Sequence, residues 1–174
     1  MKKVIITSLL TVFISVISFA RSINTEKSVV NFKISNMKVN VVRGTFSRMT
    51  GEVDFNPNKI STSSFDVCID ATTVNTDNKK RDKHLRSEDY FDVKKYPTIC
   101  FKSTTVVKTD KGYIVSGALT MHGVTQNVQI PFTLSQNTFK GSLIVKRLDY
   151  KIGNSGTFLM GNEAEIIIVA VLNL

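Results

Sequence analysis

Apolar and polar residues alternate with a period of two along most of this chain. The segment 29–35 sets Phe32 and Ile34 against polar neighbours, and the segment 64–70 does the same with Phe65. This period is typical of a half-buried β-strand. It recurs in about eight segments, at residues 29–35, 51–56, 64–70, 98–103, 112–121, 128–134, 138–148 and 164–174. The pattern therefore predicts an all-β protein.

Turn-forming residues separate these segments, as at residues 56–58 and 110–112, and no repeat or linker divides the chain. Many short antiparallel strands in one domain form either a sandwich or a barrel. Glycines within strands mark the bends that a closed sheet needs, and they occur at Gly44, Gly51, Gly117 and Gly141. This favours an extended eight-stranded antiparallel β-barrel over a sandwich, and such a barrel has room for one small ligand.

The most charged stretch, RDKHLRSEDYFD at residues 81–92, interrupts the strands. Asp77 is a candidate N-cap for a short helix over residues 78–87. On that helix Arg81 and Leu85 share a face, because they are four positions apart. The helix then has an apolar underside and a basic upper side, so we predict that it lies across the barrel as a lid.

The N-terminal residues 1–20 have the composition of a targeting segment. Lys2 and Lys3 precede an apolar stretch that ends in small residues before Ala20. This predicts a secretory signal peptide that is cleaved after Ala20, with residues 21–174 forming one exported domain. An uncleaved membrane anchor is the alternative, although the apolar stretch is near the lower limit for crossing a bilayer.

The charge and composition narrow the classes of partner. Without Lys2 and Lys3 the chain has 21 basic and 14 acidic residues, a net charge of +7. In an exported protein this charge favours anionic lipid head groups, anionic small ligands or solubility, and not nucleic acid. Hydrophobic residues make up 42% of the chain, which excludes a disordered composition, and eleven Phe with no Trp suit an apolar interior.

The chain has two cysteines, Cys68 and Cys100, each in the middle of a predicted strand. Both alternate with bulky apolar residues, so both are expected on the opposite face of their strands. A disulfide between them is expected if the strands are neighbours, and two free thiols are the alternative. Two cysteines without a nearby histidine are an incomplete set of zinc ligands, so no metal site is predicted.

The run RDKHLRSEDYFDVKKYPTICFKS at residues 81–103 resembles the hallmark of the YceI-like family of exported lipid-binding and polyisoprenoid-binding proteins. That hallmark is an Arg-Asp-x-His-Leu run followed by Phe-Asp and Tyr-Pro. The matching residues here are Arg81, Asp82, His84, Leu85, Phe91, Asp92, Tyr96 and Pro97. The likeness covers about residues 24–174, including SGALTMHGVTQNVQIPF at 116–132 and KRLDYKIG at 146–153.

This resemblance implies a lipocalin-like barrel whose pore holds a long apolar chain, such as a polyisoprenoid or a fatty-acid-like amphiphile. The corresponding role is transport, storage or stress protection in the periplasm or outside the cell. The resemblance also implies homodimers, and the positive charge adds contact with an anionic membrane surface. No cofactor and no nucleic acid partner are expected.

The expected binding site has an apolar and a polar part. Ten side chains are predicted to line the cavity: Phe32, Ile34, Phe46, Phe65, Val67, Leu85, Phe91, Phe101, Leu119 and Met121. Four basic side chains are candidates for holding a polar head group: Arg43, Arg81, His84 and Arg86. For Arg43 and Arg81 the alternative is a structural ion pair with a nearby aspartate.

Two other functions compete with lipid binding. His84 with Asp82, or His122, has the chemistry of a general base in a hydrolase. However, the chain has neither a Gly-x-Ser-x-Gly nucleophile elbow nor a His-Glu-x-x-His metal motif. We therefore expect a protein that is not an enzyme. The other alternative is a structural or stress-response protein whose cavity is filled by its own side chains.

Overall fold

A computed structural model of the protein describes residues 20–36, 40–155 and 160–173. In this part of the chain the helices are α1 (Lys79–Leu85) and the 3-10 helices η1 (Ile60–Thr62), η2 (Ala71–Thr73) and η3 (Arg147–Tyr150). The strands are β1 (Arg21–Ser22), β2 (Val29–Asn36), β3 (Asn40–Phe46), β4 (Thr50–Asp54), β5 (Ser64–Asp70), β6 (Thr98–Thr109), β7 (Gly112–Met121), β8 (Val124–Ser135), β9 (Thr138–Lys146) and β10 (Met160–Val171). Residues 1–19, which carry the expected signal peptide, lie outside the described residues.

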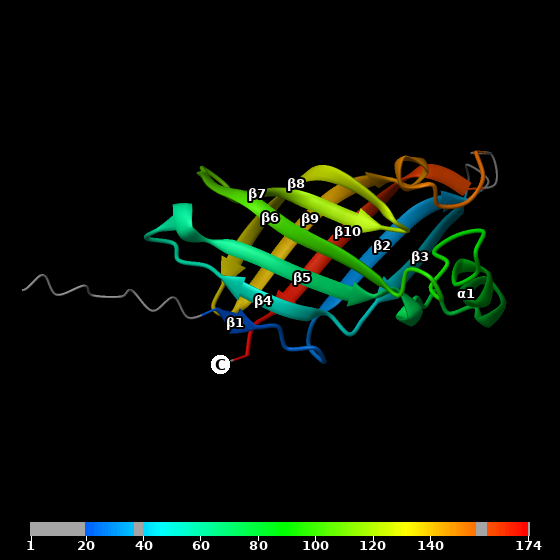
Figure 1. Ribbon diagram of the computed structural model, residues 1–174, viewed down its shortest axis with the longest axis horizontal. Coiled ribbons are helices and arrows are strands. Elements are labelled where there is room, and N and C mark those ends of the chain that lie inside the picture. The colour runs from blue at the N-terminus through cyan, green and yellow to red at the C-terminus, as the bar shows by residue number, and fades with distance from the viewer. Residues whose placement is uncertain (1–19, 37–39, 156–159, 174) are drawn as a thin grey trace, which may run out of the picture.

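The strands form one antiparallel sheet in the order β1-β4-β5-β6-β7-β8-β9-β10-β2-β3. The all-β prediction is confirmed, and the sheet curls into a half-barrel (Figure 1). Helix α1 lies at one end of this half-barrel, and β1 and the C-terminus lie toward the other end. In the described residues no helix is long and apolar enough to span a membrane.

A few backbone hydrogen bonds close the sheet beyond its regular strand pairs. Near the C-terminus, β1 pairs with β4, and the next residue, Ile23, forms a bridge to Leu172 just after β10. Near α1, Thr45 of β3 exchanges backbone hydrogen bonds with Asn75, at 2.8 and 3.0 Å. These isolated bridges connect the end of β1 to the end of β10, and β3 to the segment after η2, without a continuous ladder of paired strands.

The predicted number of eight strands is wrong, because the described residues form ten. The missing strands are β1, which has only two residues, and β3, whose alternation is interrupted by Gly44. In the sheet Gly44 lies opposite Phe32. A Cβ atom on Gly44 would lie 2.5 Å from the Phe32 ring, so the glycine leaves room for that ring. A polar–apolar pattern does not reveal such a position.

The N-cap of helix α1 lies one residue later than predicted. The side chain of Asn78, not Asp77, accepts a hydrogen bond from the backbone N–H of Arg81 at 3.0 Å. Asp77 instead has a positive φ of 56°, a conformation that Asp tolerates better than most residues. The helix covers Lys79–Leu85 of the predicted 78–87, and Asp82 and Leu85 are its buried residues.

Strands β5 and β6 are neighbours, and Cys68 and Cys100 are direct partners in their register. The two cysteines form a disulfide with an S–S distance of 2.10 Å. Of the two alternatives that the sequence left open, the disulfide is therefore the one in the structure. The bond closes a loop with a sequence separation of 32 residues, and that loop contains α1 and the charged segment that follows it.

Candidate functional site: an apolar cavity in the half-barrel

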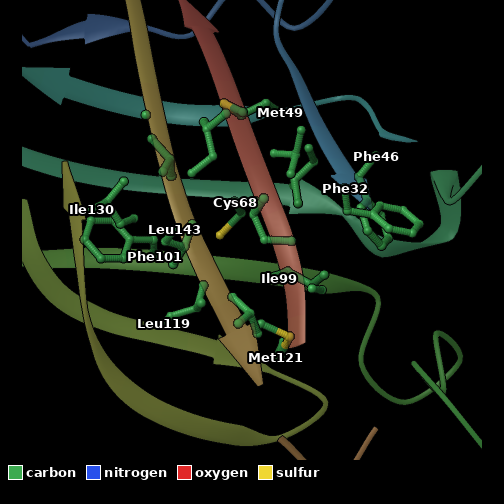
Figure 2. Close-up of a pocket in the computed structure, with 18 of the residues that line it drawn as sticks. Phe32, Phe46, Met49, Cys68, Ile99, Phe101, Leu119, Met121, Ile130 and Leu143 are labelled. Atoms are coloured by element: carbon green, nitrogen blue, oxygen red, sulfur yellow. The ribbon is translucent and has the colours of Figure 1, made fainter. Parts of the chain in front are cut away.

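The half-barrel contains a cavity of about 220 Å³ between its strands and the α1 end. Figure 2 shows part of the lining, with Leu119 and Met121 along one wall and the rings of Phe32 and Phe46 close together at another. All ten side chains that the sequence predicted for the cavity are in this lining: Phe32, Ile34, Phe46, Phe65, Val67, Leu85, Phe91, Phe101, Leu119 and Met121. Their contact with a ligand stays a prediction.

Many lining residues were not named from the sequence. They come mainly from the strands β7 to β10, and they include Val115, Ile130, Phe132, Phe139, Leu143, Val145, Met160, Ala164, Ile166, Ile168 and Ala170. Their period-two pattern shows that one face is buried, and the same pattern could have found them. Met49 and Ile152 lie outside the regular strands, so no periodicity marks them as lining residues.

Five aromatic side chains form a layer at the end of the cavity away from α1. Phe65, Phe132 and Phe139 line the cavity, and their ring centroids are 5.4 to 5.7 Å apart. Phe55 contacts all three rings, at centroid distances of 5.5 to 6.2 Å, and Tyr113 stacks on Phe132 at 5.3 Å. Tilted and edge-to-face contacts of this kind stabilise an aromatic cluster beyond its area burial. We call this layer of five rings the aromatic floor.

A second aromatic contact connects the cavity wall to the charged segment at the α1 end. The Phe91 ring meets the Phe46 ring edge-on at 5.3 Å, and Phe46 in turn lies 5.4 Å from Phe32. Leu85, the last residue of α1, is also buried and lines the cavity. The segment RDKHLRSEDYFD therefore contributes apolar side chains to the cavity wall, as its predicted apolar underside implied.

Arg81 is the one predicted head-group residue that borders the cavity. Its Nε donates to the Thr76 hydroxyl at 2.7 Å, and its Nη2 donates to the Thr76 carbonyl at 2.8 Å. The buried Asp82 carboxylate accepts hydrogen bonds from the backbone N–H and the hydroxyl of Thr76. The alternative for Arg81 was an ion pair with an aspartate. In the described contacts Arg81 and Asp82 are instead linked through Thr76, which fixes the start of α1 to the preceding loop.

The other three candidates lie away from the cavity lining. Arg86 donates to the carbonyls of Thr72 and Val74, both at 2.7 Å, and so holds the end of α1 against η2. His84 is exposed, with Nε2 3.3 Å from an Asp89 carboxylate oxygen. Arg43 is exposed on β3, directly opposite Lys33 of β2 and not beside an aspartate.

A buried cation that the sequence did not single out also lines the cavity. Arg147 is only 5% exposed, and it donates to the carbonyls of Gly161, Ile152 and Asn154 at 2.8 Å and to that of Met160 at 3.1 Å. Burial lowers the pKa of its guanidinium, and the nearby Tyr90 opposes that shift. The run KRLDYKIG contains this arginine, but nothing in the sequence indicates that its side chain is buried.

Arg147 and the segment after α1 meet at Gly153. A Cβ atom there would lie 2.9 Å from Tyr90 Cε1 and 3.1 Å from Arg147 Nη1. Gly153 also has a φ of +71°, so both its backbone and its lack of a side chain suit this crowded position. Tyr90 also lines the cavity. Both cavity-lining cations, Arg81 and Arg147, therefore lie at the α1 end, opposite the aromatic floor.

The structure does not bring the candidate catalytic residues together. Asp82 is buried under Thr76, while His84 is exposed beside Asp89. His122 has its Nδ1 3.1 Å from the Tyr150 carbonyl, and its ring meets Tyr96 edge-on at 5.1 Å. Among the described residues no three His, Cys, Asp or Glu side chains are placed to hold a metal ion.

Comparison with known proteins identifies the family to which this fold belongs. The sequence matches the YceI-like domain over residues 22–172, so the chain belongs to the YceI-like family. A UPF0312 protein of Vibrio vulnificus is 31% identical over 139 residues, which are 74% of each chain. A UPF0312 protein of Vibrio parahaemolyticus is 38% identical over 102 residues, 58% of this chain and 54% of that protein. That match spans about half the length of the relative.

Solved structures share the same architecture. BcnA of Burkholderia cenocepacia has a TM-score of 0.82 at 27% identity, over 87% of this chain and 99% of that one. A YceI protein of Campylobacter jejuni has a TM-score of 0.67 at 27% identity, over 78% and 87% of the two chains. A polyisoprenoid binding domain from Saccharophagus degradans, at 18% identity, has a TM-score of 0.68 over 88% and 98%. This last likeness shows the shared fold alone.

Proposed function

We propose that this protein is an exported binding protein that holds a long apolar amphiphile in the cavity of the half-barrel. The observation that carries the proposal is the lining of the cavity. In the described residues that lining is apolar apart from a few side chains, and its charged members are Arg81 and Arg147. A ligand of matching chemistry has a long hydrocarbon tail and one polar or anionic end. A polyisoprenoid and a fatty-acid-like lipid both have this form.

The apolar part of the lining supports binding through chain burial. Transfer of one methylene from water to such a surface stabilises the complex by about 0.8 kcal/mol. A tail of a dozen carbons therefore needs no specific contact to bind tightly. The name of the Saccharophagus degradans neighbour, a polyisoprenoid binding domain, is consistent with a ligand of this class.

The polar end of the ligand belongs at the α1 end of the cavity. Of Arg43, Arg81, His84 and Arg86, only Arg81 borders the cavity, so we assign head-group contact to Arg81 and exclude the other three from it. Arg147 adds a second positive charge at this end. A carboxylate or phosphate there gains charge-assisted hydrogen bonds that strengthen with partial burial.

One observation favours the alternative that the cavity is filled by the protein itself. Its volume of about 220 Å³ is below the ~300–1,000 Å³ of most small-molecule sites. A long chain therefore requires some lining side chains to move. Met49, Met121 and Met160 all line the cavity, and the unbranched methionine side chain adapts readily to a new shape. We therefore prefer ligand binding.

The same proposal includes the cellular setting and the partners. We assign the protein to the periplasm or the extracellular space, with a role in transport, storage or stress protection. On the outer face of the sheet Ile144 of β9 is 62% exposed and Ile167 of β10 is 51% exposed. These diagonal neighbours on adjacent strands support pairing with a second copy. The net charge of +7 that is left without Lys2 and Lys3 supports contact with an anionic membrane surface.

A displacement assay tests the proposed function. The protein is freed of bound lipid by organic extraction, refolded and loaded with a dye that fluoresces in apolar surroundings. Palmitate is then titrated, and a loss of fluorescence at a ratio near one per chain supports the proposal. A dye that does not bind, together with no heat of palmitate binding by calorimetry, contradicts it. The Thr133→Asp variant, with a new charge on the outer face of β8, serves as a control that should bind like the wild type.

A further inference from the structure

The aromatic floor closes the end of the cavity that faces away from α1. Phe65, Phe132 and Phe139 line the cavity, while Phe55 and Tyr113 contact these rings but are not part of the described lining. Phe65, Phe132 and Phe139 are all at most 8% exposed, and Phe132 and Tyr113 also line a separate, open hollow beside β7, β8 and β9. In the described residues the layer therefore separates the cavity from this hollow, and neither Phe55 nor Tyr113 lines the cavity.

The charges fix the direction in which an amphiphile enters. Arg81 and Arg147 lie at the α1 end. The aromatic floor presents phenyl rings to the cavity, and the ring stacked behind Phe132 is the phenol of Tyr113. An anionic group buried among phenyl rings lacks hydrogen-bond partners, which makes that orientation costly. The head group therefore stays near α1, and the methyl end of the tail points to the floor.

We propose that the aromatic floor limits the length of the chain that the cavity accepts. This inference rests on the proposed function, because it concerns the same cavity and the same ligand class. Each methylene between the head group and the floor adds to the affinity, and a methylene beyond that distance has no apolar space to enter. Closely packed rings yield little, because protein interiors have almost no free volume. Affinity therefore rises with chain length, reaches a limit and then stops rising.

A series of saturated fatty acids from eight to twenty carbons tests this limit by calorimetry. For the wild-type protein, affinity increases by about fourfold per methylene until the tail reaches the floor. The Phe139→Leu variant replaces a floor ring by a smaller side chain and leaves the lining apolar. We expect its affinity to go on rising at lengths where that of the wild type has levelled off, by about fourfold for each methylene that enters the new space.

The chain offers a matched control for Phe139→Leu and a second variant that should shift the length limit in the opposite direction. Phe46 is as buried as Phe139, at 6% against 5% exposed, but it packs near α1 against Phe32 and Phe91. Phe46→Leu should lower stability to a similar extent and leave the length limit unchanged. Ala170 lies directly opposite Phe139 and lines the cavity, so Ala170→Val should move the limit to shorter chains.

Each outcome decides between the readings. If fatty acids bind the wild type but Phe139→Leu and Ala170→Val keep its length limit, the floor is not the limit and the inference is wrong. The same conclusion holds if Phe46→Leu shifts the limit as much as Phe139→Leu does. If no fatty acid of any length binds the wild type, the proposed function itself fails. Near-UV circular dichroism checks that each variant is folded. If Phe139→Leu does not fold, the length limit of Ala170→Val decides the test.

Discussion

Arg81 holds Thr76 at two points, with Nε 2.7 Å from its hydroxyl oxygen and Nη2 2.8 Å from its carbonyl oxygen. The same hydroxyl donates to the buried carboxylate of Asp82, so the three residues form one network at the start of α1. Arg81 also borders the cavity. This side chain is therefore both a structural support of α1 and the expected contact of an anionic head group.

The Arg81→Ala variant separates these two roles. Loss of the two hydrogen bonds from a charged group should lower the free energy of unfolding by about 1.5–3 kcal/mol, as measured by urea denaturation. If Arg81 also binds the head group, palmitate affinity falls more than the affinity for hexadecanol, the neutral alcohol of the same length.

Arg86 provides the control for that comparison. Its guanidinium likewise donates two hydrogen bonds, in this case both to backbone carbonyls, but it does not line the described cavity. Arg86→Ala should therefore cost similar stability and weaken both ligands equally. An equal loss for both ligands in Arg81→Ala as well would restrict Arg81 to the structural role.

The disulfide between Cys68 and Cys100 should contribute about 2–4 kcal/mol to the free energy of unfolding, because it closes a loop of 32 residues. Reduction with dithiothreitol should lower the thermal midpoint of the wild type. The double variant Cys68→Ser, Cys100→Ser should have this lower midpoint with and without the reductant. A wild-type midpoint that the reductant does not change, with the bond shown to be reduced by mass spectrometry, contradicts this expectation.

Tyr150 should make the protein less stable at alkaline pH. Burial, with a smaller contribution from Asp149, raises the pKa of Tyr150 to about 12. Because the folded-state pKa lies above the unfolded value of about 10, this stabilising contribution is complete below pH 10 and is lost as the pH rises toward 12. The slope attributable to Tyr150 is at most about 1.4 kcal/mol per pH unit.

The Tyr150→Phe variant isolates this effect from other tyrosines and lysines. The Tyr150 hydroxyl has no hydrogen-bond partner among the described residues, so its removal at pH 8 should leave stability unchanged or slightly higher. Between pH 10 and 12 the variant should lose less stability than the wild type in urea denaturation. Parallel pH curves for the two proteins would show that folding does not raise the pKa of Tyr150, and would contradict this prediction.

Arg147 should be more important for stability than its place in a turn suggests. Its guanidinium donates to four carbonyls that the ammonium of a lysine cannot reach together, because only the guanidinium has a fork of five N–H groups. Arg147→Lys should therefore lower the free energy of unfolding by about 2–4 kcal/mol. Lys151→Arg, an exchange at an exposed position nearby, should change it by less than about 0.5 kcal/mol. An Arg147→Lys protein with the same free energy of unfolding as the wild type in urea denaturation would contradict this prediction.

The sequence predicts ten side chains of the cavity wall because alternation in a strand fixes which side chains share a face. Phe65, Phe101 and Leu119 are examples, since each lies in a stretch of strand whose register is regular; the irregularity in β6 comes only after Ser103. The same rule fails at β3, where Gly44 makes room for the Phe32 ring across the sheet. That relationship depends on the pairing of two strands, and no single strand contains it.

The polar part of the site was harder to predict for a similar reason. Arg81, His84 and Arg86 lie within one short run, yet each side chain leaves α1 in a direction set by its tertiary partners. Arg86 donates to the carbonyls of Thr72 and Val74, and His84 lies against Asp89 on the surface. The side chain of Arg147 is held at the cavity by hydrogen bonds to carbonyls of the loop after η3 and of β10. Hydrogen bonds to distant backbone groups leave no periodic signal in the sequence.

The central claim is that the cavity holds a long-chain amphiphile, and mass spectrometry of an organic extract of the protein tests it most directly. The protein is purified from the exported fraction of the cells, and the Thr133→Asp variant is processed in parallel. We predict a long-chain species at close to one molecule per chain in both extracts, and its loss in a folded Leu119→Asp variant, because that substitution places a carboxylate in the cavity wall. Extracts without such a species, from a protein that also takes up no fatty acid after refolding, would contradict the account.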